Sequence, residues 1–183
     1  MTTPLDRDQL PDGLSELGSA IAAEGLSVTP HVVGGAAILL TIDSTRRSTV
    51  DIDAWVNTPN DFVRSRVFEL AATIANRRGW PSEWVNDKAQ LFIPEMVSGR
   101  LDEWEFVYEI GGFRVVAARP DVLLAMKLLA GRASRDLPDL PALISAAELT
   151  TRAEIDELFE DMYPHDEMKR TTRLWLDSFY PHT

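Results

Sequence analysis

The sequence contains no cysteine among its 183 residues. A disulfide framework and a thiolate metal site are therefore both excluded. No apolar run approaches the ~20 residues that a helix needs to cross a bilayer. The first ten residues also lack the basic and apolar regions of a secretory signal. These absences predict a cytoplasmic protein with no membrane partner.

Positive charge is also scarce. Lys and Arg together number 18 against 29 Asp and Glu, which gives a formal net charge of -11. Such a chain repels phosphate at long range, which argues against a general nucleic-acid coat protein. A local basic groove remains compatible with this balance, and so does an acidic toxin matched to a basic partner. The hydrophobic content of 45% is enough for a globular core.

The most informative stretch is 34–53, which opens with two adjacent glycines after Val32 and Val33. A short helical run follows at 36–40, and then a basic turn that contains Arg46 and Arg47. Glycine lets backbone N–H groups approach a bulky anion, and the start of a helix favours negative charge. An arginine in the turn can reach a phosphate oxygen. This part of the stretch therefore predicts a phosphate-binding turn.

The same stretch closes on Asp51-Ile52-Asp53, which leads into the apolar segment 54–56. On a strand, Asp51 and Asp53 point to one face and Ile52 to the other. Two carboxylates this close repel each other unless a cation lies between them. Magnesium suits hard oxygen ligands and commonly keeps substrate phosphates as its other ligands. The pair is thus the candidate metal site.

In this order, the glycine pair, the basic residue, the Ser/Thr position and the Asp-x-Asp pair resemble the minimal nucleotidyltransferases of the DNA polymerase β superfamily. Within it, the chain resembles the AbiEii-type group, which includes toxin nucleotidyltransferases of bacterial toxin–antitoxin systems. The resemblance covers roughly residues 30–145. It implies that Asp51 and Asp53 bind Mg²⁺ and that an NTP is the substrate. The residues that carry it are Gly34, Gly35, Ala36, Arg47, Thr49, Asp51, Asp53, the run 123–128 that contains Lys127, and the run 135–140.

Lys127 is the only charged residue between Asp121 and Arg132. On so apolar a helix, a lysine either extends to water or reaches a buried anion. With the glycine turn and the acid pair upstream, a contact with the triphosphate is favoured. The acids that follow, Asp136 and Asp139, stand four residues after Arg132 and Arg135 and can simply pair with them on the surface.

The resemblance implies that one of these two acids belongs to the site and orients the lysine or the incoming hydroxyl. Asp136 is the first choice and Asp139 the second. It also implies that Arg132 and Asp139 help to bind the nucleotide, with Lys127 and Asp136 acting in catalysis.

The roles of four further residues stay open at this point. Enzymes of the polymerase β type often hold a third carboxylate on a later strand, and the candidates are Glu105 and Glu109, for which an exposed strand glutamate is the ordinary alternative. The resemblance also puts Asn86 and Asp87 at the border of the site, where a capping asparagine accounts for Asn86 equally well.

The predicted fold is α/β, in the α+β sense, with a small mixed nucleotidyltransferase-type sheet flanked by helices and a C-terminal helical extension. Residues 1–11 are predicted to be a flexible N-terminus, 12–148 the nucleotidyltransferase-like domain, and 149–183 the extension. Expected strands include 28–33, 92–94, 104–110 and 113–118. The expected helices include 14–25, 61–78, 121–131 and 165–179.

The function expected from the resemblance is magnesium-dependent transfer of a nucleoside monophosphate from NTP to a hydroxyl of RNA (such as tRNA) or protein. The chain would then be the toxin-like component of a toxin–antitoxin system, with a possible cognate antitoxin as partner. One alternative is a small-molecule nucleotidyltransferase of the antibiotic-modifying kind. The other is a catalytically inactive binding protein that keeps the fold.

Overall fold

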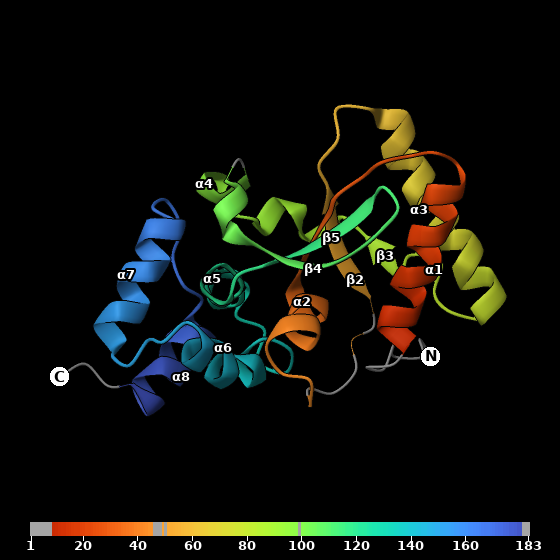
Figure 1. Ribbon diagram of the computed structural model, residues 1–183. Coiled ribbons are helices and arrows are strands. Elements are labelled where there is room, and N and C mark those ends of the chain that lie inside the picture. The colour runs from red at the N-terminus through yellow and green to blue at the C-terminus, as the bar shows by residue number, and fades with distance from the viewer. Residues whose placement is uncertain (1–8, 46–48, 50, 99, 181–183) are drawn as a thin grey trace. The chain divides into compact units, whose positions relative to one another are not determined.

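The computed structural model describes residues 9–45, 49, 51–98 and 100–180 (Figure 1). The chain forms two compact units. The first comprises Met1–Leu91 and Trp104–Ala118, and the second comprises Phe92–Glu103 and Arg119–Thr183. The chain thus leaves the first unit and returns to it before it ends in the second.

The first unit is built on a five-stranded mixed sheet in the order β3-β2-β1-β5-β4. β1 is antiparallel to β2 and parallel to β5, β2 is parallel to β3, and β4 is antiparallel to β5. The predicted mixed sheet is therefore confirmed. The strands are β1 (Pro30–Val33), β2 (Ile52–Val56), β3 (Val85–Asn86), β4 (Trp104–Ile110) and β5 (Phe113–Ala118).

Three helices accompany this sheet: α1 (Gln9–Ala23), α2 (Gly34–Thr41) and α3 (Asp61–Arg78). α1 and α3 pack against each other, and α1 also packs against β4 and β5 (Figure 1). α3 begins at the cap Asn60, whose side chain accepts hydrogen bonds from two backbone N–H groups, and ends at Gly79 in the left-handed conformation. α2 follows β1 directly and contacts β1, β2 and β5.

The two faces of the sheet differ in composition. Ile52, Ala54 and Val56 of β2 are buried and alternate with the half-buried Asp53 and Trp55. Because directly paired residues of neighbouring strands share a face, the register assigns the paired strand residues to one face or the other. We call the face that carries Asp53 and Trp55 the Asp53 face. The opposite, apolar face includes Phe113, which lies against the backbone of α1 at Gly18.

The second unit is helical. α5 packs against α6 and α7, and the short elements α4, η2 and η3 complete the unit. α7 begins at a capping box formed by Thr151 and Glu154, as its sequence pattern predicts. The elements are α4 (Glu95–Ser98), η2 (Leu101–Glu103), α5 (Pro120–Ala130), η3 (Leu137–Asp139), α6 (Leu140–Ala146), α7 (Arg152–Met162) and α8 (Arg170–Phe179).

Several element boundaries differ from those expected. α1 begins at Gln9, so the last three residues of the segment predicted to be a flexible N-terminus are helical. Leu10 is fully buried there and extends the apolar stripe of α1 by one turn. Pro11 is tolerated because a helix makes no internal hydrogen bonds through its first N–H groups.

Two further expectations were wrong. The segment 92–94 is not a strand, because the 3₁₀ helix η1 (Lys88–Phe92) runs into it and α4 starts directly afterwards. The last helix begins at Arg170, five residues later than predicted, although Met168 is buried before it starts. No helix among the described residues is long and apolar enough to cross a membrane.

Candidate active site

Gly34 is the first residue of α2 and has a left-handed backbone with φ +67°. A Cβ atom at this position would lie 3.1 Å from Oδ2 of Asp53. The proximity follows from the register, in which Val33 and Asp53 are paired across β1 and β2. A side chain at residue 34 would thus be strained and would crowd the carboxylate. Glycine is needed here for both reasons.

The alternation predicted for the acid pair is confirmed. Asp51 and Asp53 are half-buried, and Ile52 between them is fully buried. The hydroxyl of Thr49 donates to the backbone carbonyl of Asp51 at 3.0 Å and holds the chain just before β2. The site therefore presents Asp53 and the N-terminus of α2 side by side, and Asp51 lies one residue before β2.

β3 brings Asn86 to this acid pair. Asn86 is buried and is paired in register with Asp53. Its Nδ2 lies 3.5 Å from Oδ2 of Asp51 and 3.4 Å from the Glu83 carbonyl oxygen, while its Oδ1 accepts from the backbone N–H of Lys88 at 3.0 Å. Asn86 thus caps the following 3₁₀ helix and also lies next to the Asp51 carboxylate.

Lys88 is a residue of this site that sequence reasoning missed. Its ammonium group is exposed and forms an ion pair with the carboxylate of Glu83. That hydrogen bond and the Glu83 charge raise the pKa of Lys88, and the charges of Asp51 and Asp53 act in the same direction. The only signal in the sequence was its position two residues after Asn86.

Neither candidate for a third carboxylate lies on a strand next to β2. Glu105 and Glu109 belong to β4, which β1 and β5 separate from β2. Three strand spacings amount to about 14 Å. The register also pairs Glu105 with Ala117, which places it on the face opposite Asp53. The described residues contain no group of three or more Asp, Glu, His or Cys side chains that could hold a metal ion.

The donor set nevertheless suits magnesium. Mg²⁺ usually takes one or two carboxylates from the protein and fills its remaining positions with water and substrate phosphates. Asp51 and Asp53 supply the two carboxylates, and the N-terminus of α2 beside them suits a phosphate. These two residues fit the predicted role of metal ligands.

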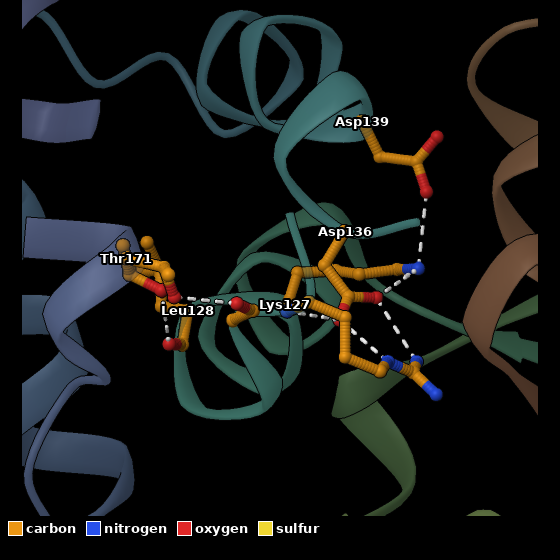
Figure 2. Close-up of polar contacts among 8 residues, drawn as sticks. Lys127, Leu128, Asp136, Asp139 and Thr171 are labelled. Carbon is orange, nitrogen blue, oxygen red and sulfur yellow. Dashed lines mark hydrogen bonds and ion pairs between the residues drawn. The ribbon is translucent and has the colours of Figure 1, made fainter. Parts of the chain in front are cut away.

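The remaining predicted residues lie in the second unit, around the ammonium group of Lys127 (Figure 2). Its Nζ lies 2.9 Å from Oδ1 of Asp136 and 3.0 Å from Oδ2 of Asp139. The guanidinium and backbone N–H of Arg132 donate to Asp136 at 2.7–3.0 Å. We call these four residues the Lys127 cluster. It contains two positive and two negative charges.

Burial and charge oppose each other at Asp136, which is 0% exposed. Burial alone would raise the pKa of its carboxyl group. The hydrogen bonds from Arg132 and the charge and hydrogen bond of Lys127 outweigh burial and lower the pKa to about 2. A carboxylate with so low a pKa is a poor proton acceptor near neutral pH. Asp136 is therefore suited to hold Lys127 in place, which is one of the two roles that the resemblance implies for it.

Lys127 lies in the last turn of α5, and α8 holds the end of that helix. The hydroxyl groups of Thr171 and Thr172 donate to the carbonyl oxygens of Gly131 and Leu128 at 2.6 and 3.0 Å (Figure 2). Gly131 is left-handed with φ +57°, and a Cβ there would lie 2.6 Å from the Thr172 hydroxyl. The C-terminal helix therefore caps the helix that carries the lysine.

The predicted residues thus form two groups. The first unit brings together Gly34, Asp51 and Asp53, with Gly35 and the buried Ala36 in the first turn of α2 and Thr49 before β2. The second unit brings together Lys127, Arg132, Asp136 and Asp139. Arg47 lies outside the described residues. The predicted contact of Lys127 with a triphosphate stays a prediction, and its ammonium group is bonded to two carboxylates of its own chain.

Comparisons with models of known protein families, with curated proteins and with solved structures found no match. The resemblance to nucleotidyltransferases therefore rests on the residues and spacings quoted above.

Proposed function

We propose that this protein is a magnesium-dependent nucleotidyltransferase that transfers a nucleoside monophosphate from an NTP to a hydroxyl group. The observation that carries the proposal is the position of the Asp53 carboxylate beside Gly34 at the N-terminus of α2. A helix N-terminus attracts phosphate, and a carboxylate pair attracts a divalent cation. A magnesium-bound triphosphate is a ligand that satisfies both together.

Each part of this site has a role in the proposed reaction. Gly34, Gly35 and Ala36 bind the β- and γ-phosphates through backbone N–H groups. Asp51 and Asp53 would hold Mg²⁺, which would supply Lewis-acid stabilisation of the charge on the α-phosphate. Asp53 accepts the proton of the attacking hydroxyl. A new bond forms between the hydroxyl oxygen and the α-phosphorus, the bond to the β-phosphate oxygen breaks, and pyrophosphate leaves.

In the biological context that the resemblance suggests, the chain is a toxin-like component of a toxin–antitoxin pair. The acceptor hydroxyl then belongs to RNA or to a protein, and a cognate antitoxin silences the enzyme. The net charge of -11 favours a partner that carries positive charge at its contact surface.

The direct test is incorporation of label. The purified chain is incubated with each α-labelled NTP and Mg²⁺ in the presence of total RNA or cell lysate, and label in RNA or protein is measured. We expect incorporation from at least one NTP, its loss with a chelator, and its loss in Asp51→Asn/Asp53→Asn. If no NTP labels either pool, or if the double variant labels as well as wild type, the proposed function is wrong.

A further inference from the structure

A row of aromatic side chains lies on the Asp53 face, beyond the acid pair formed by Asp51 and Asp53. One register row crosses four strands and consists of Trp55, His31, Val116 and Phe106. Trp104 lies on the same face, two residues before Phe106. The ring centroid of His31 is 5.2 Å from that of Trp55 and 4.6 Å from that of Trp104, distances typical of aromatic pairs. Trp55 is also only two residues beyond Asp53 on β2, so the row begins next to the candidate metal ligand.

Trp104 carries an unsatisfied donor. It is 8% exposed, and its Nε1 atom is buried with no hydrogen-bond partner among the described residues. Tryptophan N–H groups usually find a partner when they are buried, because an unpaired buried donor keeps its full cost of desolvation. The position thus has a donor that a ligand with an acceptor atom would satisfy.

His31 does not supply that acceptor, because no hydrogen bond joins it to Nε1 of Trp104. Its Nδ1 donates to the carbonyl oxygen of Thr29 at 2.9 Å, and burial lowers the pKa of the imidazole, so the ring is neutral near pH 7. His31 serves as an aromatic spacer between the two indoles.

The opposite end of the row is open to solvent. Phe106 is 58% exposed, and the guanidinium carbon of Arg114 lies 5.3 Å from the centre of its ring. An exposed aromatic ring beside an arginine, on the face of a sheet, is an element on which proteins stack the bases of nucleotides and single strands.

We propose that Trp55, Trp104 and Phe106 form a nucleobase-binding surface on the Asp53 face, in which the indole N–H of Trp104 donates to a ring nitrogen or carbonyl oxygen of the base. The inference rests on the proposed function, since it places the base beside the site that handles the phosphates. A base can come from two sources: the donor NTP or the terminal nucleotide of an RNA acceptor. Both offer the same planar ring with acceptor atoms.

Two variants test the surface. Trp104→Phe keeps an aromatic ring and removes the donor, and its effect on binding is measured under conditions in which the variant is folded, because a smaller ring at a buried position also costs stability. Phe106→Ala removes an exposed ring, and Phe179→Ala on α8, at 64% exposure, is its matched control. The probes are Mg²⁺ tripolyphosphate, the four non-hydrolysable NTP analogues with Mg²⁺, and single-stranded hexaribonucleotides, each titrated by calorimetry.

We expect Trp104→Phe and Phe106→Ala to weaken nucleotide or hexaribonucleotide binding by about fivefold or more, the lower bound for one stacked base. Tripolyphosphate binding and the Phe179→Ala control should not change. A loss confined to NTP analogues assigns the base to the donor, and a loss confined to hexaribonucleotides assigns it to the acceptor.

Unchanged affinities in both variants would overturn the nucleobase surface, as would a wild-type protein that binds neither kind of base. If wild type does not bind tripolyphosphate but the variants still lose base binding, the surface stands and the proposed transfer reaction fails. The two ideas are therefore separable.

Discussion

The chain carries two groups of acidic residues that differ in what neutralises them. In the Lys127 cluster, two buried carboxylates meet two cations of the same unit at hydrogen-bond distance. Asp51 and Asp53 are half-buried, and the exposed Lys88 is a cation whose charge interacts with both. Removing one partner of a buried, internally compensated cluster is costly, because a charge is then left buried without its partner. A partly exposed carboxylate pair has room for an external cation. The comparison predicts that stability depends on the first group and chemistry on the second.

The largest effect is expected at the acid pair. Asp51→Asn or Asp53→Asn should lower nucleotidyl transfer by about 10³-fold or more, because a bound metal supplies several kcal/mol to the transition state and each 1.36 kcal/mol is tenfold. The free energy of unfolding should change by less than about 1 kcal/mol, since neither side chain is buried in the core. Labelled transfer and urea unfolding check the two halves. Wild-type rates in both variants would remove the two-carboxylate site.

Lys127→Ala, in contrast, should lower the free energy of unfolding strongly. It leaves Asp136 and Asp139 without their shared partner, and breaking a buried pair costs about 3–5 kcal/mol. Lys169→Ala, at an exposed lysine, should stay within about 0.5 kcal/mol of wild type. Chemical denaturation of both variants makes the measurement. Equal stabilities would mean that the cluster contributes nothing to the fold.

A separate experiment asks whether Lys127 also contacts the triphosphate. Under conditions in which Lys127→Ala is still folded, its affinity for a non-hydrolysable NTP should fall by about 1.5–3 kcal/mol, as for a charge-assisted hydrogen bond. Calorimetric titration beside Lys169→Ala measures this. Identical affinities would leave Lys127 with a structural role alone, and the comparison between the two groups would become sharper.

Acid should weaken the Lys127 cluster in a defined window. The pKa of Asp136 falls from an ordinary 3.8 to about 2 on folding. A lowered pKa adds stability above pH 4, about 2 kcal/mol here, which is lost as the pH falls from about 4 to 2. Asp136→Asn lacks this contribution, so its free energy of unfolding should depend less steeply on pH in that window. Parallel pH profiles for the two proteins would contradict the assignment.

The smallest effect is expected at the glycine turn. Gly34→Ala forces a side chain into a left-handed backbone, which costs roughly 1–2 kcal/mol, and crowds the Asp53 carboxylate. Transfer should fall as well, because that carboxylate must shift. Gly35, which is not among the described glycines with positive φ, is the matched control, and Gly35→Ala should cost less. Thermal unfolding and labelled transfer compare the two, and equal losses would show that the left-handed turn is unimportant.

Local patterns predicted most of the secondary structure of the first unit. The alternation at 51–56 and the apolar spacing within 61–78 correspond to β2 and α3, because each element presents one apolar side to the core. β3 was missed as a strand since it has two residues, too few for any periodicity. The segment 92–94 was misassigned because a short apolar run has no period that separates a strand from a turn.

The features of the candidate site likewise divide into those that local sequence patterns predicted and those that they did not. The sequence by itself determined the glycine turn, the alternating acid pair and the isolated lysine, because each depends on neighbours within a few residues. Only the tertiary structure decided that Asn86 and Lys88 lie at the acid pair and that Glu105 and Glu109 are strands away from it. It also decided that Lys127 bonds Asp136 and Asp139, and that Trp104 carries a buried, unpaired N–H. Strand order, register and burial arise from contacts between distant segments, and no local pattern encodes them.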